Sequence, residues 1–233
     1  MKIVFTPDWF LGQDVLIEVF SFMILFLFFF FAVKSYKLSK NKKILYLGIG
    51  FLLIAVGELS TILTKLVLYY DTDIIMDLGQ IIITQKIFQS VDIFYYVGFC
   101  LNRFFTLFGL YVIYKLPLKE ISGDFFLTIY LIMIVALFSH YFYYFYYLTV
   151  LVFLFFIIYN YLGVYKKNKS VNTQILIVAF SILAISQVIF MLSRLTQLYV
   201  VAQSIQLMSY ITLLILIMRL SNGKKKEQNR DNS

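Results

Sequence analysis

Long apolar stretches alternate with short polar ones along the whole chain, and this pattern predicts a bundle of transmembrane helices. A membrane-spanning helix needs about 20 mostly apolar residues, and the chain has room for seven such spans. They are about Val15–Val33, Ile44–Leu68, Ile93–Leu116, two spans that together run from near Phe125 to near Tyr165, Ile175–Leu192 and Ser204–Leu220. We therefore predict an all-α integral membrane protein with seven transmembrane helices in one domain, residues 1–220, and a short basic cytoplasmic tail, residues 221–233.

Composition and charge agree with a multi-pass protein of the cell membrane. Hydrophobic residues make up 62% of the chain, against about 45–50% in soluble domains. The net charge of +8 does not indicate nucleic-acid binding, because the lysines form short clusters between the apolar stretches. The expected partner is therefore the lipid bilayer. The first ten residues contain Pro7 and Asp8 and do not have the pattern of a cleavable signal peptide.

The distribution of basic residues predicts the orientation. If the loop with Lys34–Lys43 is cytoplasmic, 15 basic residues fall on that side and four on the other. The four are Lys2, Lys65, Lys86 and Arg194. Under the positive-inside rule, this bias places the N-terminus outside and the C-terminus in the cytoplasm.

Two connections have a distinctive composition. Residues 72–91 mix apolar and polar side chains and are expected outside the membrane. This extracellular amphipathic segment is either a helix lying on the surface or an extended helix leading into the third span. The fourth and fifth spans leave almost no room for a loop, so we expect their turn in the aromatic run Tyr141–Tyr147.

The chain resembles itself when it is displaced by 129 residues. Residues 36–66 then match residues 165–195 without gaps, and eight of the 31 positions are identical: Tyr36/Tyr165, Lys37/Lys166, Lys40/Lys169, Leu47/Leu176, Phe51/Phe180, Ala55/Ala184, Leu63/Leu192 and Leu66/Leu195. A displacement of 104 residues places the third span on the seventh, with Asn102 opposite Gln206. We predict a parallel internal repeat in which two triplets of helices flank a linking fourth helix.

This 3+1+3 plan resembles the sugar-efflux SWEET transporters and the microbial rhodopsins. The SWEET-type Pro-Gln pair is missing, and residues 206–212 of the last span contain no lysine, so a retinal Schiff base is excluded there and no cofactor is expected. The lysine-rich first turn with Tyr36–Leu47, and the stretch Phe180–Leu220, resemble uncharacterised archaeal seven-helix proteins. Some of these resemble the membrane sensor modules of histidine kinases. The resemblance implies a family without an established activity.

Polar residues in the middle of the spans form the candidate site. Counted at about 1.5 Å per residue from the nearest cytoplasmic end, five spans place a polar side chain roughly 18–24 Å deep. Such residues must face the bundle interior or water. The candidate ligand-binding or polar-layer residues are Glu18, Glu58, Asn102, Arg103, Gln187, Gln203 and Gln206. They either hold helices together or form a ligand pocket between the two repeats.

Glu58 and Arg103 are expected to form an ion pair, because they lie on sequential helices at similar depth. Such a pair predicts that the destabilisation caused by Glu58→Gln and by Arg103→Leu is not additive.

Three functions remain open from the sequence. The first is a receptor or sensor without enzymatic activity, which would need a cytoplasmic signalling partner because the tail is short. The second is a small-solute transporter or channel built from the two repeats, working as a homo-oligomer. A closed pocket favours the first and a polar path across the bilayer the second. An enzyme acting on lipid is the third, with only Cys100 and His140 as soft nucleophile or base. No metal site is expected.

Overall fold

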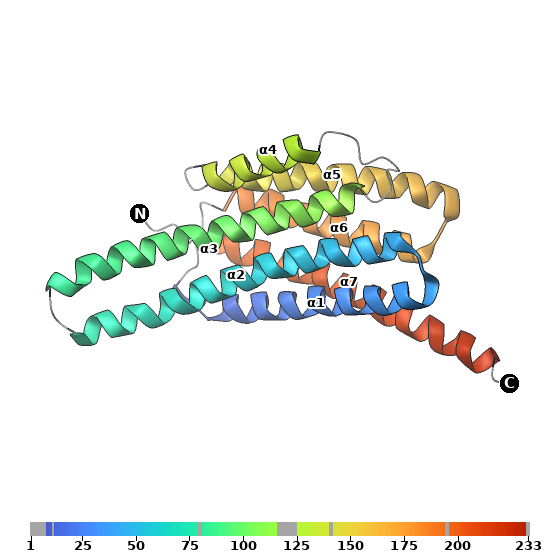
Figure 1. Cartoon of the computed structure of the whole chain (residues 1–233), viewed down its shortest axis with the longest axis horizontal. Helices are drawn as coiled ribbons and strands as arrows, with labels where there is room; N and C mark the ends of the chain where they lie inside the picture. The colour runs from blue at the N-terminus through green and yellow to red at the C-terminus, as the bar shows by residue number, and fades with distance from the viewer. Residues whose placement is uncertain are drawn as a thin grey trace.

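The apolar stretches become helices in the computed structural model of the protein (Figure 1). The structure describes residues 8–10, 12–78, 81–115, 125–139, 142–193 and 196–231, with the backbone alone for 8, 38–39, 68–78, 81–93, 196 and 220–231. A short 3-10 turn, η1, precedes seven α-helices in these ranges. They are η1 (Asp8–Phe10), α1 (Gln13–Ser39), α2 (Lys42–Leu78), α3 (Ile81–Lys115), α4 (Phe125–Phe138), α5 (Tyr143–Asn168), α6 (Val171–Met191) and α7 (Thr196–Asp231).

Six of these helices are long and apolar enough to cross a membrane. The candidate spans are Gln13–Lys37, Lys42–Val67, Phe94–Lys115, Tyr143–Asn168, Val171–Met191 and Gln197–Arg219. In the described part of the chain, α4 is also apolar but has 14 residues. The prediction of an all-α, multi-pass membrane protein is thus confirmed, with six to seven apolar helices.

The helices alternate in direction along one common axis, so all the connections with clustered lysines lie at one end of the bundle (Figure 1). This end, here called the basic end, holds the α1–α2 turn at Lys40, the α5–α6 turn at Lys169, and the residues Lys115 and Arg219. At the opposite end α2 and α3 project beyond the other helices (Figure 1). Residues 72–78 prolong α2 and residues 81–91 begin α3, so this stretch is found at the ends of two long helices.

Two turns at the basic end have the same local geometry. Lys40 and Lys169 are the non-glycine residues of the described chain with a positive φ, at 53° and 44°. Each ends a helix in the left-handed conformation. The Lys40 amide donates a hydrogen bond to the carbonyl of Tyr36 at 2.8 Å, and the Lys169 amide donates one to Tyr165 at 2.7 Å.

Six helices form a closed ring. In order around it, α1 packs against α2, α2 against α3, α3 against α5, α5 against α6, α6 against α7, and α7 against α1. Helix α4 packs on the outside of α3 and α5, at the edge of the bundle (Figure 1). The ring therefore encloses the interior without α4.

Small residues bring α2 and α3 together inside this ring. A Cβ atom added to Gly109 would lie 2.6 Å from the backbone oxygen of Gly50, so the two backbones touch where both residues have no side chain. Close backbone approach at glycine is a common way for membrane helices to associate.

The turn between α4 and α5 corrects one expectation. Helix α4 ends at Phe138 and α5 begins at Tyr143, so the connection overlaps only the start of the run Tyr141–Tyr147, and most of that run forms the first turns of α5. His140 lies outside the described residues.

Candidate functional site

A cavity of about 330 Å³ lies inside the ring and is lined by six helices: α1, α2, α3, α5, α6 and α7. All seven polar residues singled out from the sequence line it: Glu18, Glu58, Asn102, Arg103, Gln187, Gln203 and Gln206. Other polar lining residues are Ser21, Thr61, Lys65, Tyr95, Thr106, Tyr143, Tyr146, Tyr147, Tyr199 and Tyr210. This volume is at the small end of ligand pockets, which span about 300–1,000 Å³.

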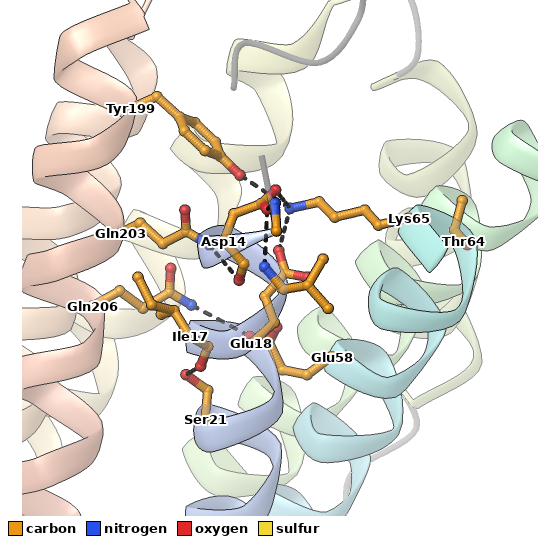
Figure 2. Close-up of polar contacts among 12 residues, drawn as sticks. Asp14, Ile17, Glu18, Ser21, Glu58, Thr64, Lys65, Tyr199, Gln203 and Gln206 are labelled. Atoms are coloured by element: carbon orange, nitrogen blue, oxygen red, sulfur yellow. Dashed lines mark hydrogen bonds and ion pairs between the residues drawn. The ribbon is translucent and has the colours of Figure 1, made fainter. Parts of the chain in front are cut away.

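A buried ionic cluster lies at the end of the cavity that is far from the basic end (Figure 2). The Lys65 ammonium of α2 lies 2.7 Å from a carboxylate oxygen of Asp14 and 2.5 Å from one of Glu18, both on α1. The side chains of Lys65 and Asp14 are 3% and 0% exposed. We refer to Asp14, Glu18 and Lys65 as the ionic triad.

Helix α7 lies on the other side of this triad and contributes two polar side chains to it (Figure 2). The Lys65 ammonium donates a hydrogen bond to the hydroxyl of Tyr199 at 3.4 Å. The side-chain amide of Gln203 donates one to the backbone carbonyl of Asp14, also at 3.4 Å. Asp14 in addition accepts hydrogen bonds from the amides of Gly12 and Val15 at the start of α1. The triad thus joins α1, α2 and α7.

Glu58 is bound by α7 and belongs to a second polar cluster. One of its carboxylate oxygens accepts hydrogen bonds from the Tyr210 hydroxyl at 3.2 Å and from the Gln206 amide at 3.3 Å. Gln206 also donates to the Tyr210 hydroxyl at 2.9 Å. Glu58 is 9% exposed, so these donors replace water around a buried carboxylate.

The predicted ion pair between Glu58 and Arg103 is wrong. The Arg103 guanidinium instead donates a hydrogen bond to the Ser139 hydroxyl at 2.8 Å, just beyond α4, and lies 5.7 Å from the centre of the Tyr146 ring. Among the described residues, neither is within 4.0 Å of an oppositely charged side chain. Glu58 and Arg103 both line the cavity, as their similar depth predicts, but the Glu58 side chain is directed towards α7 and the Arg103 side chain towards α5.

The two remaining amide-bearing candidates lie on α3 and α6. Asn102 is half-buried beside the cavity. Gln187 is 6% exposed, and its amide contacts the hydroxyl of Ser186 at 3.3 Å.

Towards the basic end, the cavity stops on packed apolar side chains. Phe51 of α2 and Phe180 of α6 stack with ring centres 6.1 Å apart and planes 5° from parallel. Each is 1% exposed. Leu25, Leu110 and Leu213 surround them and also line the cavity. The polar lining therefore ends on an apolar floor, beyond which the buried core continues with Ile113, Leu176, Leu216 and Ile217.

Sequence reasoning missed the ionic triad as a unit. The positive-inside count places Lys65 outside the membrane, and the first predicted span begins at Val15, one residue after Asp14. A usable signal was present, because Lys65 follows Glu58 by two helical turns and therefore shares its face of α2. Cys100 of α3 is not among the residues that line the cavity.

Comparisons with known protein families, with curated proteins and with solved structures give no match. The resemblance to archaeal seven-helix proteins and to sensor modules thus stays a sequence-based expectation, and no family is identified. The chain is a helical multi-pass membrane protein with six to seven apolar helices and a polar cavity inside a ring of six.

Proposed function

We propose that the protein is a membrane receptor that binds a small ligand in the central cavity and does not convert it chemically. The observation that carries this proposal is the polar cavity closed by an apolar floor. Its carboxylates are engaged by Lys65, Gln206 and Tyr210. A pocket with convergent polar groups and aromatic walls is the usual form of a small-molecule site.

The apolar floor of the cavity favours ligand binding over the conduction of a solute across the membrane. Between the Phe51–Phe180 stack and the basic end, the buried core is built mainly of packed apolar side chains such as Ile113, Leu176 and Leu216, and this packed layer is not a row of polar groups that could guide a hydrated solute. A channel would need such a row or an open path.

The basic end belongs in the cytoplasm if the positive-inside rule holds. The protein then has its N-terminus outside and its C-terminus inside, and the cavity lies in the outer half of the bundle. A ligand would enter from outside the cell. A cytoplasmic signalling partner would bind at the basic end, where α7 extends beyond the ring (Figure 1).

A second candidate is a small-solute transporter built from two related helix triplets. The lining residues favour this relation. Seven pairs of them are separated by the repeat displacement of 129 residues: Ile17/Tyr146, Glu18/Tyr147, Ser21/Val150, Phe51/Phe180, Ile54/Leu183, Glu58/Gln187 and Thr61/Phe190. Four more are separated by 104 residues: Tyr95/Tyr199, Phe99/Gln203, Asn102/Gln206 and Thr106/Tyr210.

Three further features support a parallel repeat. Lys40 and Lys169, which align in the sequence, share the same left-handed turn. Phe51 and Phe180, which also align, contact each other as residues close to a two-fold axis would. The ring order is unchanged when α1, α2 and α3 are exchanged for α5, α6 and α7. Transporters bind solutes at such repeat interfaces and rock the halves around them.

Access to the cavity separates the two candidates. Thr61 lines the cavity from α2, so a Thr61→Cys variant carrying Cys100→Ala reports on it. A membrane-impermeant thiol reagent is applied to vesicles of known orientation. A receptor predicts labelling only from the side opposite the basic end. A transporter predicts labelling from both sides. A cysteine protected from both sides would contradict both functions.

A further inference from the structure

The charges around the cavity are divided between its two sides. Three carboxylates, Asp14, Glu18 and Glu58, lie where α1 and α2 meet α7, with Lys65 as the cation among them. Arg103 lies on α3 and reaches towards α5. One side therefore has a formal excess of negative charge, and the other carries a positive group.

Two buried oxygen atoms on the acidic side accept no hydrogen bond from the described residues. They are the second carboxylate oxygen of Glu18 and the side-chain oxygen of Gln203. Glu18 is 8% exposed and Gln203 4%, and both line the cavity. A buried acceptor without a donor is costly, and such groups usually receive a hydrogen bond from a ligand or water. Both oxygen atoms are therefore suited to accept a hydrogen bond from a ligand, and the carboxylate oxygen favours a cationic donor.

The Arg103 guanidinium is suited to a ligand group of the opposite kind, an anionic hydrogen-bond acceptor. It has five N–H donors, and within the described chain its hydrogen-bond partner is the neutral hydroxyl of Ser139. Guanidinium groups bind carboxylates in a bidentate geometry that the ammonium of lysine cannot reproduce. Among the described residues this cavity-lining arginine has no carboxylate partner, so it is matched to an anionic ligand group.

We propose that the ligand is a small zwitterion of the amino-acid class, with its ammonium group at Glu18 and Gln203 and its carboxylate at Arg103. This inference rests on the proposed binding function and specifies its ligand. A simple anion would meet Arg103 but face the carboxylates, and a simple cation would leave Arg103 without a counter-ion. A neutral sugar would supply donors but no charge for either side.

The size and walls of the cavity agree with this class of ligand. About 330 Å³ accommodates one small molecule. The lining has an apolar and aromatic part, which includes Phe51, Phe99, Phe180 and Phe190. An apolar side chain of an amino acid fits this part, so the inference favours amino acids such as leucine or phenylalanine over glycine.

The test measures binding to the purified full-length protein by thermal stabilisation and by calorimetry. The probes are the common L-amino acids, a set of neutral sugars, and two analogues of leucine: isoamylamine, which has no carboxylate, and 4-methylpentanoate, which has no ammonium. We expect at least one apolar amino acid to bind, and each single-charge analogue to bind at least tenfold more weakly.

Variants assign the two charged groups of the ligand. Arg103→Gln should weaken amino-acid binding at least tenfold and leave isoamylamine binding unchanged. Gln203→Leu, which leaves the ionic triad intact, should weaken amino-acid and isoamylamine binding and spare 4-methylpentanoate. Leu63→Phe on the outer face of α2 is the control, because Leu63 is exposed and does not line the cavity.

Two results would overturn the inference in different ways. Binding of a sugar, or equal binding of leucine and either analogue, would leave the cavity a ligand site but exclude the zwitterion. Absence of binding by every probe, together with protection of Thr61→Cys from both sides of the membrane, would overturn the inference and the proposed function alike.

Discussion

Replacing Lys65 with methionine should be among the most destabilising single changes in this protein. Methionine keeps the length and apolar part of the lysine side chain and removes its charge. Asp14 and Glu18 would then share a buried site, at side-chain exposures of 0% and 10%, without the ammonium that now lies within 2.7 Å of both. Removing one partner of a buried ion pair costs about 3–5 kcal/mol, so we expect a loss of about that size.

The free energy of unfolding can be measured by titrating SDS into the detergent-solubilised protein and following the circular dichroism. The triple variant Asp14→Asn, Glu18→Gln, Lys65→Met should recover most of the loss, because no uncompensated charge remains. Lys43→Met is the control. Lys43 is exposed at the basic end, and its replacement should change stability by at most about 0.5 kcal/mol. A loss below about 1 kcal/mol in Lys65→Met would refute the account of the ionic triad.

Three further predictions concern the helix packing, the floor and the corrected ion pair. Gly109→Ala should lower the free energy of unfolding by about 1–3 kcal/mol, because its Cβ would lie 2.6 Å from the backbone of α2. Gly163→Ala is the matched control. Its Cβ would meet no atom within 4 Å, so the variant should be neutral or stabilising in the same SDS titration. Phe51→Ala should cost about 3–5 kcal/mol by the same measurement, and an unchanged stability would contradict a packed floor. Glu58→Gln and Arg103→Leu should be additive within about 0.5 kcal/mol in a double-mutant cycle, because they bind different partners; a coupling above 1 kcal/mol would restore the direct pair.

The sequence was sufficient to predict the apolar spans and to predict which polar residues face the interior of the bundle. Apolar length identifies a membrane helix because lipid imposes a fixed thickness on it. The cost of a polar group in lipid then predicts that Glu58, Arg103 and Gln206 face inwards. All of them line the cavity.

The contacts between those residues could not be predicted in the same way. Depth along a helix follows from counting residues, but the rotation of one helix against another depends on packing throughout the bundle. Glu58 and Arg103 therefore share a depth yet face different neighbours. Arg103 binds Ser139, which lies just after the end of α4. No periodicity in the sequence indicates that contact.

Lys65 shows a second limit. A lysine near the end of a span is ordinarily assigned to the membrane surface, where its long side chain reaches water. Here the side chain turns inwards because two carboxylates of α1 lie opposite it, 47 and 51 residues away in the chain. The positive-inside count is not weakened by this, because without Lys65 the 15 basic residues oppose the three others, Lys2, Lys86 and Arg194.

The central claim is that the cavity holds a small ligand, and native mass spectrometry tests it most directly. The wild-type protein, the cavity-filling variant Thr61→Phe and the control Leu63→Phe are purified with native lipids and exposed to the same metabolite extract. Both substitutions lie on α2, but Thr61 lines the cavity and Leu63 is 51% exposed on the outer face of the bundle. We predict a small molecule bound to the wild type and to Leu63→Phe and absent from Thr61→Phe. Equal binding by all three proteins, or by none of them, would contradict the claim.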